Sequence, residues 1–252
     1  MRLAGVAAIV TGGASSFGAA TARRLSQLGA KICPVDVYET LGQQVADEIG
    51  GRFATANVAD EAGVTAALDV GEAAHGVARV LVSCAGIGKS ICTVDREGQP
   101  MPLDILRRIV DVNLVGAFTM MSRFAARLCL LERFGEERGV IIKTASVAAY
   151  EGQIGQAAYA ASKCGIVSMT LPIAGDLAQL RIRVVTIAPG LFLTPLMQGM
   201  PEPALEALPS RCHSRAGSAI PMSMPHSPPR SSTIRCLSET IRLDGAIRMG
   251  PR

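Results

Sequence analysis

The chain has 252 residues, 49% of them hydrophobic and 18% charged, which is enough to bury a substantial core and most simply predicts one domain spanning residues 1–252. Its formal net charge is only +4 and no basic cluster with interleaved aromatic residues occurs, so we expect no nucleic-acid partner. No apolar run reaches the roughly 18 residues of a membrane span, and the three histidines lack metal-ligand spacing, so we expect neither a membrane nor a metal.

The cysteines and the amino terminus predict a cytoplasmic location. Seven cysteines form no CxxC pair, and most of them lie in apolar segments. This distribution favours reduced thiols over a disulfide framework. The first residues also lack the pattern of a signal peptide.

The beginning of the chain predicts a dinucleotide-binding unit. Apolar residues 6–10 predict a strand, residues 11–18 a glycine-rich turn, and residues 19–28 a helix that stops at Gly29. Glycine lets the backbone approach a pyrophosphate, and the amino end of a helix offers unpaired N–H groups and a positive dipole end. The expected cofactor contacts in this turn are Gly12, Ser15, Phe17 and Gly18.

The residue at the end of the second predicted strand indicates which dinucleotide binds. Apolar residues 32–35 end at Asp36, whose carboxylate can accept hydrogen bonds from both ribose hydroxyls of an adenosine. The same negative charge would repel a 2′-phosphate. The sequence therefore favours NAD over NADP.

Strands and helices keep alternating along the chain. Further strands are expected at 52–58, 79–83, 140–144 and 183–187, and helices from an Asp60 N-cap to residue 74, at 103–131 and at 156–180, with Pro172 bending the last one. The pattern predicts an α/β fold, a doubly wound parallel sheet of the Rossmann type with helices on both faces. Ligands bind at the carboxyl ends of such strands. The further cofactor contacts expected there are Asn57, Val58, Cys84, Ala85, Gly86, Pro189 and Gly190.

Tyr159 and Lys163 are candidates for proton transfer. They lie four residues apart, so on a helix they share one face. A lysine ammonium beside a phenol lowers the phenol's pKa, and such a tyrosine can exchange a proton with a substrate alcohol or carbonyl. Ser146, just after an apolar run, could contact the same oxygen. Such a pair also occurs by chance on surface helices, and it gains weight only from the dinucleotide-binding unit that precedes it.

Together these motifs resemble the short-chain dehydrogenase/reductase family, from about residue 3 to 200 and again near residue 239. Four stretches resemble its type 2 3-hydroxyacyl-CoA dehydrogenases (17β-hydroxysteroid dehydrogenase type 10-like): TASVAAYEGQIGQAAYAASK, GIVSMTLPIA, IAPGLFLTPL and TIRLDGAIRM.

The resemblance implies a role for each matching residue. Tyr159 would be the general acid/base, and Lys163 would lower its pKa and hold the nicotinamide ribose. Ser146 would orient the substrate oxygen and Gln156 would face the substrate. Asn113 would anchor a water that leads to the lysine, and Thr194 would contact the carboxamide. The implied reaction passes a hydride between NAD and the 3-carbon of a short hydroxyacyl-CoA or oxoacyl-CoA, in a homotetramer.

Four positions depart from the family pattern: Ser16 replaces a glycine of the first turn, Asn57 an aspartate, and Ser83 and Lys143 each an asparagine. Because the glycine can need an unusual backbone angle, Ser16 raises a question about cofactor affinity.

Residues 211–238 are rich in serine, proline and arginine and have no apolar period. Codons exist for this segment that, read one nucleotide earlier, encode VPFPRRLGDPDEYAPLAAQIVDNPMLE, which resembles the subfamily. We interpret the segment as a compensated frameshift, the alternative being a genuinely divergent loop.

Two other functions stay open at this point. A 3-oxoacyl-carrier-protein reductase would normally prefer NADPH, which Asp36 disfavours. A folded but inactive scaffold protein would suit the departures at Ser16 and Lys143, but Asn113, Ser146, Tyr159 and Lys163 are all present.

Overall fold

The computed structural model describes residues 2–190 and 240–243. Strands and helices alternate in its first half, as the apolar periodicity predicts. The elements are β1 Ala7–Thr11, α1 Ser16–Gln27, β2 Lys31–Asp36, α2 Glu39–Ile49, β3 Ala54–Thr55, α3 Glu61–His75 and β4 Val80–Ser83.

The second half contributes the longer helices. Its elements are α4 Leu103–Val110, a π-helical turn Asp111–Val115, α5 Gly116–Leu128, β5 Gly139–Thr144, a 3-10 turn Val147–Ala149, α6 Ala157–Ser168, α7 Thr170–Ala178, β6 Ile182–Pro189 and β7 Thr240–Leu243.

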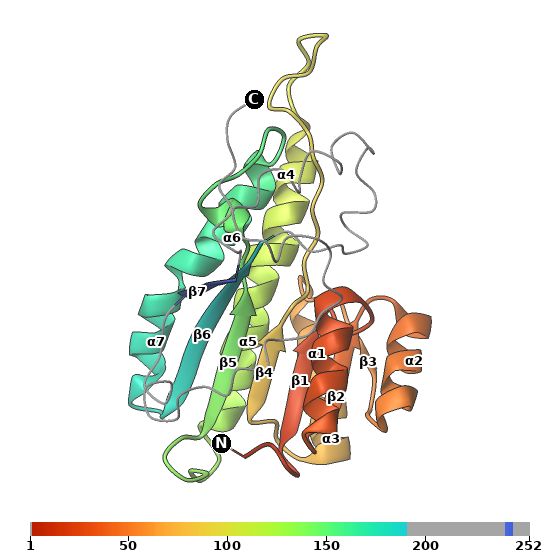
Figure 1. Ribbon diagram of the computed structural model, residues 1–252, viewed down its shortest axis with the longest axis vertical. Coiled ribbons are helices and arrows are strands. Elements are labelled where there is room, and N and C mark those ends of the chain that lie inside the picture. Colours follow the sequence, from red (N-terminus) through yellow and green to blue (C-terminus); the bar gives the residue numbers. More distant parts are fainter. Residues whose placement is uncertain (1, 191–239, 244–252) are drawn as a thin grey trace, which may run out of the picture.

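The described strands form one sheet in the order β3-β2-β1-β4-β5-β6-β7, which runs from right to left in Figure 1. Every neighbouring pair is parallel. The strand order reverses between β1 and β4, and ligands of doubly wound sheets bind beside such a reversal, at the carboxyl ends of the strands. The predicted fold class is confirmed.

Both faces of the sheet are buried, which explains the nearly continuous apolar strands. Alternate residues of β1 point to opposite faces. Ala7 and Ile9 pack in a cluster with residues of α3, α5 and α7. Ala8 and Val10 pack in a second cluster with residues of α1 and α2. The two layers hold the carboxyl ends of the strands in fixed register.

Some elements differ from the sequence expectation. The third strand covers only Ala54–Thr55 rather than 52–58, and α2 was not expected. The N-cap of α2, Tyr38, makes no side-chain capping bond, so the usual start signal is missing. By contrast, Asp60 caps α3 as expected, since its side chain accepts from the amides of Ala62 and Gly63.

The two long helices are interrupted. The expected helix 156–180 divides at Met169 into α6 and α7. Pro172 lacks the N–H that would bond four residues back, which accounts for a break near this point. The expected helix 103–131 contains the π-helical turn Asp111–Val115.

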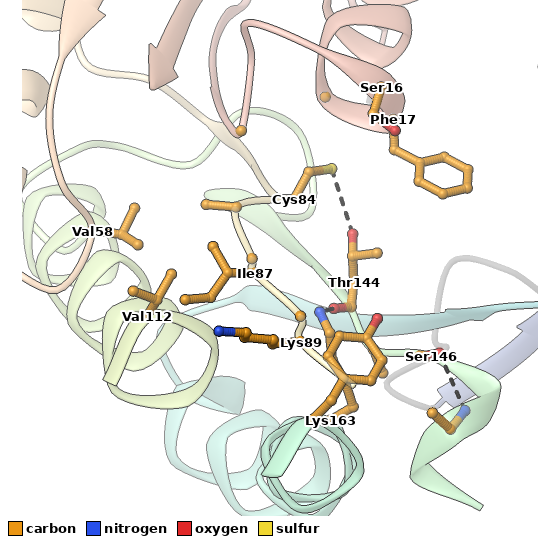
Figure 2. Close-up of a pocket in the computed structure, with 18 of the residues that line it drawn as sticks. Ser16, Phe17, Val58, Cys84, Ile87, Lys89, Val112, Thr144, Ser146 and Lys163 are labelled. Atoms are coloured by element: carbon orange, nitrogen blue, oxygen red, sulfur yellow. Dashed lines mark hydrogen bonds between the residues drawn. The ribbon is translucent and has the colours of Figure 1, made fainter. Parts of the chain in front are cut away.

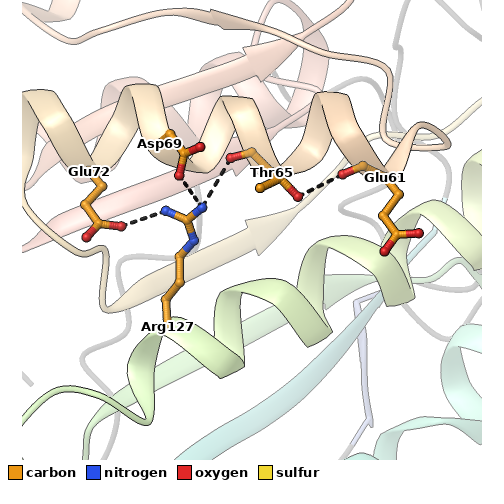
Figure 3. Close-up of polar contacts among 5 residues, drawn as sticks. All are labelled: Glu61, Thr65, Asp69, Glu72 and Arg127. Carbon is orange, nitrogen blue, oxygen red and sulfur yellow. Dashed lines mark hydrogen bonds and ion pairs between the residues drawn. The ribbon is translucent and has the colours of Figure 1, made fainter.

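An arginine joins α3 to α5 (Figure 3). The Arg127 guanidinium donates to a carboxylate oxygen of Glu72 at 2.6 Å and to the Thr65 carbonyl at 3.3 Å, and it also pairs with Asp69. These contacts fix the helix that follows the π-helical turn against the neighbouring helix on the same face of the sheet.

Among residues 2–190 and 240–243, one helical stretch, 103–128, is long and apolar enough to cross a membrane by length and composition alone. Its side chains Met120, Phe124 and Leu128 are buried in the core cluster of the α/β fold. The core helix of a soluble protein meets the same criteria of length and hydropathy.

The cysteines in the described part of the chain are free thiols: Cys33, Cys84, Cys92, Cys129 and Cys164. The segment 211–238 lies outside the described residues.

Candidate active site

A cleft of about 870 Å³ opens at the carboxyl ends of the strands (Figure 2). It brings together segments from β1 to β6 that lie far apart in the sequence. Nearly all of the predicted site residues line it: Gly12, Ser15, Phe17, Gly18, Asp36, Asn57, Val58, Cys84, Ala85, Gly86, Ser146, Gln156, Tyr159, Lys163, Pro189 and Gly190. Asn113 lies behind its wall, and Thr194 lies outside the described residues.

The first turn brings the start of α1 close to the end of β1. Gly12 has a φ of +67°, and a Cβ there would lie 2.8 Å from the Ala85 backbone nitrogen. A Cβ at Gly18 would lie 2.0 Å from the Gly12 carbonyl oxygen. The N-cap Ser15 makes no side-chain capping bond, so α1 presents its positive end and the Ser15 hydroxyl to the cleft. This arrangement fits a diphosphate.

Ser16 is strained. Its φ is +50°, in the left-handed region that costs an L-residue about 1–2 kcal/mol. Its side chain lines the cleft. The family glycine is therefore replaced at a position where the backbone does require a glycine-like angle.

The Asp36 carboxylate is held in place by backbone amides. One oxygen accepts from Ala14 at 3.0 Å, and the other accepts from Val37 at 2.7 Å and from Tyr38 at 3.2 Å. These three bonds fix the orientation of the carboxylate, which lines the cleft and keeps further acceptor capacity for a ligand. The arrangement suits ribose hydroxyl donors and disfavours a phosphate.

The side chain of Thr11 joins the two strands at the point where the strand order reverses. Its hydroxyl oxygen accepts from the amides of Cys84 and Ala85, both at 3.2 Å. The Cys84 sulfur lies 3.4 Å from the Thr144 hydroxyl. Burial raises the pKa of the Cys84 thiol, against smaller opposite effects of the Thr144 hydrogen bond and of Lys163.

Ser146, Tyr159 and Lys163 all line the cleft, and Figure 2 shows Ser146 and Lys163 on the same side of it. The Ser146 hydroxyl is hydrogen-bonded to the Tyr159 phenol. Tyr159 and Lys163 both lie on α6, and the lysine Nζ is 5.7 Å from the centre of the tyrosine ring. The same Nζ donates to the Thr144 carbonyl at 2.8 Å. Ser146 ends the segment after β5, where its hydroxyl accepts from the Ala148 amide at 3.1 Å.

The expected lowering of the Tyr159 pKa is wrong. Burial raises the pKa of this phenol, and the Ser146 hydroxyl opposes the rise only in part. Burial also lowers the pKa of Lys163 to about 8, with a smaller opposite effect of Cys84. Desolvation acts on both groups because they share a partly closed site, and it exceeds the attraction that the spacing alone suggests.

Asn113 connects three segments behind the cleft. Its side-chain amide donates to the Ile87 carbonyl at 2.9 Å and to the Ser162 hydroxyl at 3.0 Å, and its oxygen accepts from the Ile87 amide at 2.8 Å. Asn113 is fully buried on the π-helical turn. It thus fixes the loop after β4 to the helix that carries Tyr159 and Lys163.

The other departures from the family pattern lie in or beside the sheet. Lys143 is fully buried, and its Nζ donates to the Ile166 carbonyl of α6 at 2.9 Å. Burial lowers the pKa of Lys143 to about 8. Ser83 pairs with Lys143 in the β4–β5 register. The Asn57 side-chain oxygen accepts from the Ala59 amide at 3.1 Å.

Three supporting groups were not predicted as part of the site: the Thr11 hydroxyl, the Thr144 carbonyl and the Ser162 hydroxyl. Ser162 lies three residues after Tyr159 and so shares its helical face. That spacing could have identified it, whereas the contacts of Thr11 and Thr144 depend on tertiary packing. Within residues 2–190 and 240–243, no group of three or more His, Cys, Asp or Glu side chains could hold a metal ion.

The fold and this site define an oxidoreductase of the short-chain dehydrogenase family, and the chain belongs to that family. Residues 6–204 match the family model described as short chain dehydrogenase. The chain is 46% identical to 3-hydroxyacyl-CoA dehydrogenase type-2 of Rattus norvegicus and 45% identical to that of Homo sapiens, in each case over 98% of this chain and 97% of the relative. The crystal structure of 3-hydroxyacyl-CoA dehydrogenase type-2 from Mycobacterium avium superposes with a TM-score of 0.86 at 34% identity, covering 98% of both chains.

Proposed function

We propose that the chain catalyses NAD-dependent oxidation and reduction at the 3-carbon of short 3-hydroxyacyl-CoA and 3-oxoacyl-CoA thioesters. The observation that carries the proposal is the convergence of Ser146, Tyr159 and Lys163 beside the glycine-rich turn in one cleft. The names of the similar proteins supply the substrate class.

Asp36 supports NAD rather than NADP. Its carboxylate stands at the end of β2, held by three amides, where it would bind the adenosine ribose hydroxyls. Gly12, Ser15 and the start of α1 would hold the diphosphate. When bound, the nicotinamide accepts the hydride from the 3-carbon or returns it there.

Side chains of the protein transfer the proton that accompanies the hydride. Tyr159 hydrogen-bonds the substrate oxygen and takes its proton during oxidation or returns it during reduction. The raised pKa of its phenol keeps the proton available for the reductive direction. Ser146 orients the same oxygen, and the Lys163 ammonium, held by the Thr144 carbonyl at 2.8 Å, lies 5.7 Å from the centre of the phenol ring.

Three further residues would contact the ligands or support the site. Gln156, the N-cap of α6, lines the cleft next to Tyr159 and would contact the acyl group. Asn113 holds the loop after β4 in place, and a water bound near it would connect Lys163 to solvent. Thr194 would contact the nicotinamide carboxamide.

We also propose a homotetramer in the cytoplasm. Apolar side chains on the outer faces of the long helices are exposed, with Phe118 at 49% and Leu171 at 69%. A second subunit would cover such side chains.

A single substitution tests the chemistry. Tyr159→Phe should lower kcat for acetoacetyl-CoA reduction, followed by NADH absorbance, by about 10²–10⁴-fold. NADH binding, measured by calorimetry, should stay nearly unchanged. Tyr150→Phe, at an exposed tyrosine outside the cleft, is the matched control. A wild-type protein that binds NADH without turning over any thioester would favour the scaffold function, and preference for NADPH would favour the reductase.

A further inference from the structure

The cleft has a positively charged end that the catalytic groups do not use. Lys89, on the loop after β4, and Arg107 and Arg108, on α4, all line the cleft and are exposed. Within the described part of the chain, none of the three forms an ion pair or a side-chain hydrogen bond. Their charges are therefore available to a ligand.

Two segments, the loop after β4 and α4, bring the three cations to the same cleft. Figure 2 shows the Lys89 side chain directed toward Val112. Arg108 lies four residues before Val112 on the same continuous helix, so the two share a face one turn apart. We call Lys89, Arg107 and Arg108 the cationic rim.

The loop that carries Lys89 is packed against the substrate side of the cleft. The Ile91 amide donates to the Gly155 carbonyl at 2.9 Å, and the Ser90 hydroxyl lies 3.5 Å from the Ile154 carbonyl. Gln156, which would contact the acyl group, directly follows Gly155. The cationic rim thus borders the segment that would contact the acyl group.

Carboxylates also occur at this end of the cleft. Asp104 and Asp111 line it too, three or four residues from each arginine. They reduce the local positive charge without pairing with the arginines in the described structure, which leaves three positive and two negative charges. A purely solvated helix face would also show alternating charges, but it would not need to border a substrate cleft.

The charged groups of a bound dinucleotide would be held elsewhere in the cleft. Its diphosphate would lie at Gly12 and the start of α1, and Asp36 disfavours a phosphate on the adenosine ribose. A second phosphate-bearing ligand is the one that matches these charges. An acyl-CoA carries its phosphates at the far end of a long pantetheine arm, so they must lie at the mouth of the cleft while the 3-carbon reaches Tyr159.

We propose that Lys89, Arg107 and Arg108 bind the phosphate groups of the CoA part of the substrate. This inference rests on the proposed function and adds the residues that would distinguish a CoA thioester from a thioester without phosphates. Lysine and arginine bind phosphate through charge-assisted hydrogen bonds, and arginine does so in a bidentate manner.

The test is the triple variant K89Q/R107Q/R108Q, assayed with acetoacetyl-CoA and with phosphate-free acetoacetyl-N-acetylcysteamine. We expect KM for acetoacetyl-CoA to rise about tenfold or more, with kcat nearly unchanged. Both kcat and KM for the phosphate-free thioester, and KM for NADH, should stay the same. The control K31Q/R96Q/R133Q removes the same charge from exposed positions outside the cleft and should change none of these values.

A second readout does not depend on turnover. Calorimetry with adenosine 3′,5′-bisphosphate, a fragment of CoA, in the presence of saturating NADH should show binding to the wild type and a loss of about tenfold in the triple variant. Three results of the triple variant would each overturn the proposal. The first is an equal rise in KM for both thioesters, and the second is a change only in the preference for NADH over NADPH. The third is unchanged binding of the CoA fragment. A wild type that reduces neither thioester but binds the fragment through these residues would refute the proposed function and keep the phosphate site.

Discussion

Replacing Lys143 should stabilise the protein. This lysine is fully buried in the central strand β5, and burial lowers its pKa to about 8 from the ordinary 10.5. Because a tenfold change in a proton equilibrium corresponds to about 1.4 kcal/mol, keeping the ammonium in the folded state costs about 3 kcal/mol at neutral pH. Lys143→Met removes this cost and conserves most of the buried volume. The Ile166 carbonyl keeps a second donor, the Thr170 hydroxyl at 3.2 Å.

The pH dependence has a definite sign. Below the folded pKa of about 8, both the folded and the unfolded lysine are charged, so the full cost is present. Between about 8 and 10.5 the unfolded chain holds more protons than the folded one, so wild-type stability rises toward that of the variant. Lys163 and the buried thiols titrate in both proteins and cancel in the difference.

Urea unfolding followed by circular dichroism measures this difference. The free energy of unfolding of Lys143→Met should exceed that of the wild type by about 3 kcal/mol near neutral pH and by about half as much near pH 9.5. Lys31→Met, at an exposed lysine of β2, serves as the control and should change little at either pH. A variant that is less stable than the wild type at neutral pH, or a difference that does not depend on pH, would refute the reasoning.

Three further predictions concern the turn, the catalytic lysine and the helix contact. Ser16→Gly should raise the free energy of unfolding by about 0.5–1 kcal/mol, because it relieves a φ of +50°. Ser15→Gly, at a residue with extended backbone, should not raise it. Equal effects of the two substitutions on thermal stability would contradict this account. The kcat/KM for acetoacetyl-CoA reduction should fall as pH rises above about 8, because Lys163 is cationic below its lowered pKa and loses its charge above it; a flat profile up to pH 10 would argue against that pKa. Arg127→Met should cost about 1 kcal/mol in urea unfolding, since its carboxylate partners are largely exposed. High salt should shrink that loss, and an unchanged loss would indicate packing rather than charge.

The sequence predicts the fold and most of the cleft because local signals carry that information. The apolar runs that end in glycine, aspartate or serine place the carboxyl ends of the strands, and the fold brings those ends together. The spacing of Tyr159 and Lys163 places both on one face of α6 without any tertiary information.

Burial could not be predicted in the same way. The direction of the Tyr159 pKa depends on how much water the fold excludes, which no spacing reveals. Lys143 shows the same difficulty, since a charged residue in a strand is usually a solvated one. The partners of Asn113 come from two other segments, and the α2 helix starts without a side-chain cap.

The π-helical turn at Asp111–Val115 makes the number of residues in this helix part of the catalytic design. Such a turn arises when one extra residue is accommodated within an α-helix. Deleting one residue here would let the helix become regular while α4 and α5 keep nearly the same orientation relative to each other, because the wider turn had absorbed the extra residue. Asn113 itself lies within the turn, so its side chain would move away from Ile87 and Ser162, and a change in helix length should disrupt the site even though α5 keeps its packing against the sheet.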